Sequence, residues 1–181
     1  MSYIWIEDTN IANIQTNSNG LFSANASGPT EFSLWIGGQK VSQLGSLFIQ
    51  GVHNPLLRDS AAKASCAITT NNKKANHGGD HYMIPFFFGE DWTKCLPLVA
   101  LQYHDVEIRI KCRDGYTPAG SPQVWGNYIY LDTDERSFFV DNEHEILITQ
   151  TQHQLANSGD TEFDLSYFNH PVKSLHLVSG K

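Results

Sequence analysis

The sequence predicts an all-β fold, an antiparallel jelly-roll sandwich with short helices in its connections. Apolar and polar residues alternate along several segments, as in a strand with one buried and one solvent-facing side. The ten Phe and seven Tyr residues favour strands, because flat rings pack well on a pleated surface. Long segments rich in Gly, Pro, Asn and Ser separate the patterned ones, which is typical of a sandwich with elaborate loops.

Five segments alternate regularly and are predicted to be strands with one buried face: residues 31–36, 104–111, 145–152, 162–167 and 174–178. In the second of these, Val106, Ile108 and Ile110 share one face, while acidic and basic residues occupy the other. Such a strand belongs to a sheet that covers a core on one side and meets water on the other.

Residues 83–88 and 124–131 are apolar on both sides, which predicts strands pressed between two layers. Pro85 has no backbone amide to donate, so its strand is expected at a sheet edge, at a strand start or at a bulge.

Helix signals are few and short. A helix that starts near Ser46 is expected to end at Pro55, because proline breaks the helical hydrogen-bond ladder. Asp91 is expected to cap a turn that runs through Leu96 to Leu101. Residues 132–139 carry acidic side chains early, which favours a short helix or a turn.

Charge and hydropathy exclude several classes of protein. The net charge is −7 and the basic residues are scattered, so direct binding to nucleic acid is not expected. No run of about 18 apolar residues predicts a membrane span. The opening residues lack the basic start and apolar stretch of a signal peptide, which argues against secretion.

Three cysteines, Cys66, Cys95 and Cys112, are too widely spaced and odd in number for a zinc motif or a disulfide framework. Reduced structural thiols in a cytosolic setting are expected. Asn25 begins a glycosylation sequon, but such triplets are common by chance and no signal peptide accompanies this one.

Histidines raise the question of a metal site. His77 and His81 flank a Gly-Gly-Asp stretch that superficially suggests a cupin-like centre. A cupin needs two histidines one residue apart on a strand, whereas these lie four apart in a glycine-rich loop. A solvated loop without metal is therefore expected.

Possible acid–base pairs are His104 with Asp105, and His144 with Glu143 or Glu145. Neighbours on a strand point to opposite faces, so these pairs are not expected to converge on one substrate atom.

An acidic cluster, formed by Asp132, Asp134, Glu135 and Asp141, makes calcium binding conceivable. The spacing and central glycine of an EF-hand are absent, and an acidic turn balanced by Arg136 is simpler. Nucleophile-elbow, P-loop and dinucleotide motifs are also absent. We therefore expect no catalytic, cofactor-binding or metal-ligating residues, and no cofactor.

Several strings resemble the major capsid proteins of the nucleocytoplasmic large DNA viruses. In that family's order they are residues 36–41, 84–88, 95–106, 128–136, 144–148 and 168–173. The most specific are CLPLVALQYHDV at 95–106 and YIYLDTDER at 128–136. The resemblance runs from about Phe32 to Leu177, is poor over 42–80, and is weak or absent over 1–30.

The resemblance implies a structural virion protein rather than an enzyme, a subunit of an icosahedral capsid shell that self-associates as a trimeric capsomer. The implied partners are other copies in a homotrimer, neighbouring capsomers and minor capsid proteins, with no direct nucleic-acid contact. The implied location is the virion, after assembly in the host cytoplasm.

The family's subunit contains two jelly rolls in tandem, and 181 residues are too few for both. Residues 1–141 are expected to form the later part of the first jelly roll. Residues 142–181 are expected to form the crossing and the first strands of the second, so that the chain is a fragment.

Two alternatives from other classes remain. A carbohydrate-binding, lectin-like jelly roll would use exposed Trp5, Trp92 or Trp125 as a platform for a sugar ring. A cupin-like metalloenzyme would use His77, His81 and His104. Fold alone does not decide between these functions.

Overall fold

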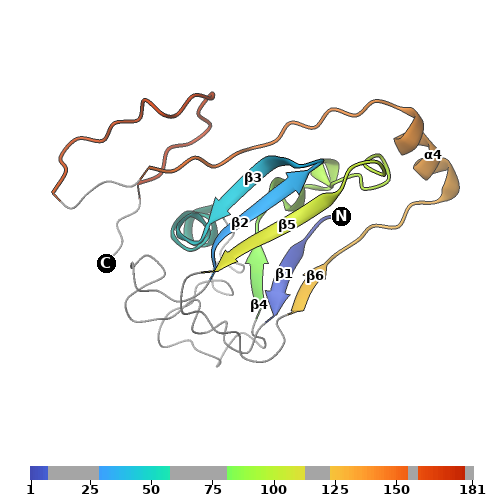
Figure 1. Ribbon diagram of the computed structural model, residues 1–181, viewed down its shortest axis with the longest axis horizontal. Coiled ribbons are helices and arrows are strands. Elements are labelled where there is room, and N and C mark those ends of the chain that lie inside the picture. Colours follow the sequence, from blue (N-terminus) through green and yellow to red (C-terminus); the bar gives the residue numbers. More distant parts are fainter. Residues whose placement is uncertain (8–28, 58–80, 113–122, 155–158, 178–181) are drawn as a thin grey trace.

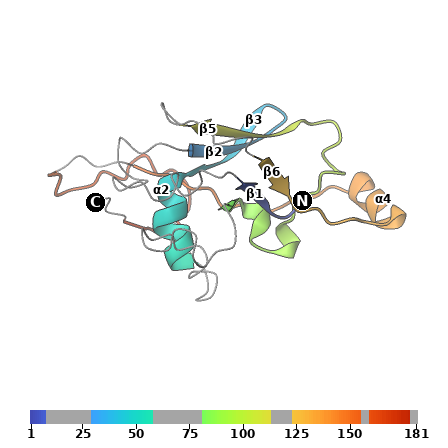
Figure 2. The ribbon, with the colours of Figure 1, turned by 90° about the horizontal axis from the view of Figure 1, so that it is seen from below.

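The computed structural model describes residues 1–7, 29–57, 81–112, 123–154 and 159–177. In this part of the chain, six strands form two three-stranded sheets, ordered β4-β1-β6 and β3-β2-β5 (Figure 1). The strands are β1 (Ile4–Glu7), β2 (Pro29–Ile36), β3 (Gln39–Gly45), β4 (His81–Ile84), β5 (Val106–Cys112) and β6 (Gln123–Gly126). Every pairing is antiparallel, and the sheets lie as two layers (Figure 2), so the predicted antiparallel sandwich is confirmed.

The predicted strands at 31–36 and 104–111 are β2 and β5, which pair with each other. Phe32 and Leu34 of β2 are fully buried between the sheets, as the alternating pattern requires. On the opposite face, the guanidinium of Arg109 lies 4.1 Å from the ring centre of Trp35, a cation–π contact. The period-two pattern therefore assigned the correct face to both strands.

Two glycines turn the chain between β2 and β3. Gly37 and Gly38 have φ angles of +57° and +78°. Positive φ at both central residues gives a two-residue hairpin turn whose twist matches that of the flanking strands. The backbone amide of Gly37 also donates to the carbonyl of Asp105, at 3.0 Å, which ties this turn to the start of β5.

The core lies between the sheets, and aromatic residues after β4 fill one end of it. β4 ends at Ile84, and the chain then enters a short 3-10 turn, η2 (Phe87–Gly89). The strand predicted for 83–88 is therefore too long, because Pro85 cannot donate a ladder hydrogen bond. The turn lets three consecutive aromatic residues enter the core: Phe86, Phe87 and Phe88.

The strand predicted for 124–131 is wrong beyond Gly126. β6 is a sheet edge that pairs only with β1 among the described strands. Its ladder continues as far as Asn127, which exchanges backbone hydrogen bonds with Ser2 and Tyr3. Residues 128–131 join no ladder among the described strands, and Tyr130 is 96% exposed.

Three other predicted strands, at 145–152, 162–167 and 174–178, join no ladder among the described residues. Residue 178 lies outside that description. Residues 162–167 include a turn, in which the carboxylate of Asp164 accepts from the amide of Ser166 at 2.9 Å. Alternation defines an apolar face, but a strand also needs a neighbour with free backbone groups.

The helices are short, as predicted. α2 (Ser46–Phe48) leads into a π-helical segment, η1 (Ile49–Leu57), so the chain stays helical past position 55, where an end was expected. Wide π turns bond residue i to i+5 and do not follow the α geometry on which that expectation rested.

Asp91 caps a turn as predicted, but that turn ends at Lys94 and does not run on to Leu101. It is the 3-10 turn η3 (Trp92–Lys94), in which the Asp91 carboxylate accepts from the amide of Trp92 at 2.7 Å. The short helix predicted near 132–139 is also confirmed, as α4 (Thr133–Asp141).

Candidate assembly surface

The most exposed apolar part of the sandwich and its connections begins at strand β6. We call residues 123–142 the β6–α4 arm. Figures 1 and 2 show α4 standing away from both sheets at the end of this arm. Its exposed large apolar residues are Val124, Trp125, Tyr128, Ile129, Tyr130, Phe138 and Val140. Apolar groups gathered on a projecting element are typical of a protein–protein contact.

Helix α4 is held by local interactions. Asp132 accepts from the backbone amide of Glu135 at 2.9 Å, and the Glu135 carboxylate accepts from the amide of Asp132 at 3.3 Å. This reciprocal capping box satisfies two amides at the helix start and places acids at the positive end of the helix dipole. Most of the acidic cluster predicted from the sequence therefore has a structural role at a helix end.

No side chain of α4 is buried. At its end, the ring of His144 lies 5.0 Å from that of Phe139, and His144 Nε2 is 3.0 Å from the Phe139 carbonyl oxygen. His144 therefore packs on the helix end, and Glu143 and Glu145 on either side of it are exposed. This arrangement agrees with a structural role rather than with an acid–base pair.

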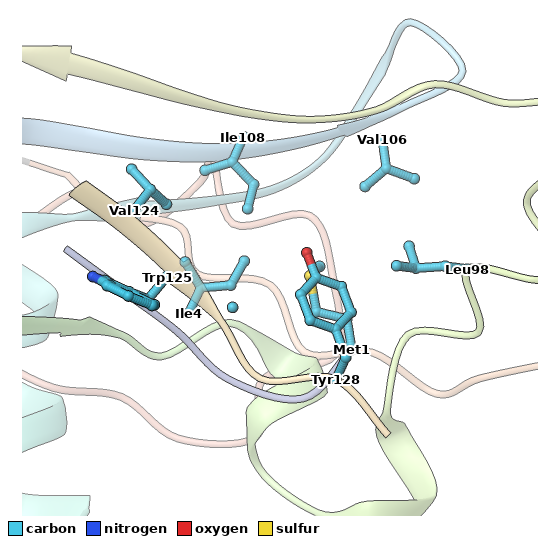
Figure 3. A pocket seen from close by; sticks show the side chains of 9 residues that line it. Met1, Ile4, Leu98, Val106, Ile108, Val124, Trp125 and Tyr128 are labelled. Carbon is cyan, nitrogen blue, oxygen red and sulfur yellow. The ribbon is translucent and has the colours of Figure 1, made fainter. Parts of the chain in front are cut away.

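An apolar cavity of about 240 Å³ opens beside the arm, between the edge strands of the two sheets (Figure 3). Val106 and Ile108 reach it from β5, and Val124 and Trp125 reach it from β6. Ile4 and Leu98 complete its apolar wall, and Met1 and Tyr128 also line it. The lining side chains bring no set of converging polar groups, which a reaction site would need.

Of the three histidines considered as metal ligands, only His104 has a described side chain. His77 lies outside the described residues, and His81 opens β4 with its side chain also outside them. His104 is exposed beside the β2–β3 turn, where its Nδ1 would lie 2.9 Å from a Cβ placed on Gly37. Among described residues, no three His, Cys, Asp or Glu side chains are grouped to hold a metal.

Two of the three tryptophans proposed as a sugar platform do meet. The rings of Trp5 and Trp125 stack across β1 and β6, with centroids 6.3 Å apart and planes within 8°. Trp92 lies on η3 and is 77% exposed.

Of the cysteines, Cys95 is free and partly buried. Cys66 and the sequon at Asn25 lie outside the described residues, as does the side chain of Cys112. In the part of the chain that is described, no helix has the length and hydrophobicity to cross a bilayer.

Sequence reasoning did not single out Phe138 or Val140 as surface residues. The helix has no strong apolar face, and its high exposure follows from its position away from the sheets. The one available signal was the YIYLDTDER string, which leads directly into this helix.

The family model and the similar proteins all describe capsid proteins. A family model described as the N-terminus of the major capsid protein matches residues 29–132. The major capsid protein of Pyramimonas orientalis virus is 40% identical over 102 residues, which cover 52% of this chain and 26% of that protein. Capsid protein 1 of Acanthamoeba polyphaga mimivirus is 33% identical over 114 residues, covering 53% of this chain and 19% of that protein. The chain thus spans about a quarter or less of the length of these relatives.

Solved structures show the same fold. The quasi-atomic model of the PBCV-1 virus capsid superposes with a TM-score of 0.57 at 22% identity, over 82% of this chain and 40% of that one. A second match, the PBCV-1 VP54 crystal structure fitted into a reconstruction of the virophage Sputnik, has a TM-score of 0.55 at 22% identity and the same coverage. These likenesses confirm the jelly-roll class predicted from the sequence.

The names of the relatives describe structural components of virion capsids, which agrees with the expectation of a structural rather than an enzymatic family. The match to the family model covers more than half of the chain. This chain therefore belongs to the major capsid protein family of large DNA viruses.

Proposed function

We propose that this chain is part of a subunit of the icosahedral capsid shell of a large DNA virus, and that the subunit associates as a trimeric capsomer. The observation that carries the proposal is the match of residues 29–132 to the N-terminus of the major capsid protein. The jelly-roll sandwich and its exposed apolar arm support this proposal, because the arm offers apolar surface that other polypeptide could bury.

The same match supports a proposed division of the chain. Residues 1–141 form the later part of a first jelly roll, and residues 142–181 form the crossing and first strands of a second. In support, every described strand precedes residue 127, and the extended residues after α4 carry strand-like alternation. Strands of this kind form a ladder once a neighbouring strand is present.

The β6–α4 arm is the surface that we propose for contacts between copies. Aromatic residues dominate the centres of protein interfaces, because large rigid rings bury much area with little loss of conformational freedom. Tyr128, Tyr130 and Phe138 are each more than half exposed on this arm. Their burial against another copy would remove them from water.

The proposed partners are other copies in the homotrimer, neighbouring capsomers and minor capsid proteins, in the virion after assembly in the host cytoplasm. We do not propose direct contact with nucleic acid, because the net charge of −7 disfavours binding to phosphate groups.

Analytical ultracentrifugation tests the trimer and its surface together. We expect the full-length subunit that contains this chain to sediment as a trimer, and the double variant Tyr130→Ser with Phe138→Ser to weaken association by at least about tenfold, since tenfold requires only about 1.4 kcal/mol. The control is Leu177→Ser, which changes a residue that is 82% exposed outside the arm. A wild-type monomer would contradict the trimer, and a trimer unaffected by the double variant would contradict the arm.

Glycan binding tests the alternative function. A carbohydrate-binding jelly roll predicts sugar binding by the folded monomer and its loss on Trp125→Ala, the more exposed member of the Trp5–Trp125 stack. A glycan array without specific binding would exclude the carbohydrate-binding alternative.

A further inference from the structure

After α4 the chain returns to the sandwich and crosses it on the side away from the cavity. The side-chain amide of Gln150 donates to the carbonyl of Val41 in β3, at 2.6 Å. The hydroxyl of Thr149 donates to the carboxylate of Glu90, just beyond η2, at 3.1 Å. The cavity lies between β5 and β6, whereas β3 and β4 are the opposite edges of the two sheets. Residues 146–150 therefore lie along that opposite side.

The side chains of this segment alternate between the core and water. Ile146 and Ile148 are partly buried and pack against the hydrophobic core, whereas Leu147 between them is 86% exposed. Among the described strands, β3 pairs with β2 alone, so the segment is attached by side chains rather than by a ladder. The segment covers apolar surface as a strand would, but no backbone ladder hydrogen bonds to a described strand hold it in place.

Glu90 is the residue on which several distant parts of the chain converge. Its carboxylate bonds Lys94 Nζ at 2.5 Å as well as the Thr149 hydroxyl. Burial alone would raise the pKa of Glu90. The hydrogen bond and charge of Lys94, the hydrogen bond of Thr149 and the charge of Lys173 together lower it below its ordinary value. The turn after β4, the crossing segment and the carboxyl-terminal region thus all interact with one charge.

We propose that residues 146–150 form a clasp that closes the β3 side of the sandwich, with Glu90 as the positioning residue that holds it. The clasp shields the apolar residues of that side and fixes the direction in which the chain leaves the first sandwich. This role concerns the fold of a single chain and goes beyond the capsid function proposed above. It needs neither a trimer nor a shell.

Limited proteolysis of the 181-residue chain tests the clasp, because a natural cleavage point, Glu145, directly precedes the segment. A glutamyl endopeptidase cuts after Glu145, and cleavage requires the segment to leave the sandwich surface. We expect Glu90→Ala to increase the rate of this cut about tenfold. The matched control is Glu107→Ala, which removes a surface carboxylate paired with Arg109 at 2.8 Å and should leave the rate unchanged.

A second pair of variants tests the apolar half of the clasp within the segment itself. Ile148→Ala removes an inward side chain and should also accelerate cleavage after Glu145, whereas Leu147→Ala removes an outward one and should not. Circular dichroism on each variant establishes that the sandwich remains folded. Equal cleavage rates in the wild type, Glu90→Ala and Ile148→Ala would overturn the proposal, as would equal acceleration by Ile148→Ala and Leu147→Ala.

Discussion

The sandwich and the segment after β6 contain similar sequence patterns but differ in how deeply their apolar residues are buried. Phe32 and Leu34 of β2 are fully buried, whereas no described residue after β6 falls in the buried class. Both regions alternate apolar and polar residues, as in 31–36 and 162–167. What separates them is a neighbour: β2 has a strand on each side, and residues 162–167 have none among the described strands. An alternating apolar pattern therefore shows which side chains can be buried, and a neighbouring strand determines whether they are buried.

The largest expected effect distinguishes the two regions directly. Phe32→Ala should lower the free energy of unfolding by about 3–5 kcal/mol, because it removes a fully buried ring and leaves a cavity. Phe163→Ala, at a residue 51% exposed, should change it by no more than about 0.5 kcal/mol. Urea unfolding followed by circular dichroism measures both. Similar losses for the two variants would mean that the second region is as well packed as the first.

The β2–β3 turn allows a sharper comparison within the packed region. Gly37→Ala and Gly38→Ala both force a side chain into positive φ, which costs about 1–2 kcal/mol each. Only the first also places its Cβ 2.9 Å from His104 Nδ1, while the second meets nothing within 4 Å. Gly37→Ala should therefore be the more destabilising of the two in the same unfolding measurement. The opposite order would show that His104 moves aside without loss.

In the exposed region, stability should depend on local bonds. Asp132→Ala removes the capping box of α4 and should destabilise that helix by about 1 kcal/mol. The control is Asp141→Ala, at the other end of the helix, where an acid opposes the dipole and its removal should be neutral or slightly favourable. Amide exchange of residues 133–141 reports on both variants. Faster exchange in the control alone would show that the cap does not hold this helix.

The smallest expected effect links the two regions through pH. The folded-state pKa of Glu90 is lowered by its contacts, with Lys94 and Lys173 as the charges that face it. The stabilisation is thus present above the carboxyl's unfolded pKa and lost as pH falls through the folded one. The difference in unfolding free energy between the wild type and Glu90→Gln should shrink over that acidic range. It will be small, because water screens a partly exposed carboxylate. A difference that stays constant with pH would exclude a contribution from the charge.

The sequence was sufficient for the fold class and for β2 and β5, because each of these strands carries a regular pattern and has a full-length neighbour. It was insufficient for 124–131, where the apolar pattern continues to Leu131 but the ladder ends at Asn127, opposite Ser2 and Tyr3. Periodicity describes one strand at a time, whereas strand length in a sheet depends on two. The four-residue strand β1 itself is too short to give a periodic signal.

The capping box of α4 and the Glu90–Thr149 contact differ in how far the sequence predicts them. The acidic residues of α4 predicted a helix start, and the structure places them in a capping box. The Glu90–Thr149 contact joins residues 59 positions apart, and nothing near Glu90 in the sequence points to Thr149. The alternation of Ile146 and Ile148 predicted an inward face but not the surface that this face would cover.

The position of β1 has a consequence for the time course of folding. This first strand is central in its sheet, and Ser2 bonds to Asn127, 125 residues later. At a synthesis rate of about 5–20 residues per second, Ser2 waits roughly 6–25 s for that partner to be made. During this interval Ile4 and Ile6 lack their native neighbours, because both strands that pair with β1 lie far along the chain. The β4-β1-β6 sheet thus forms only after long-range pairing, a topology associated with slow folding and with exposure to other nascent chains.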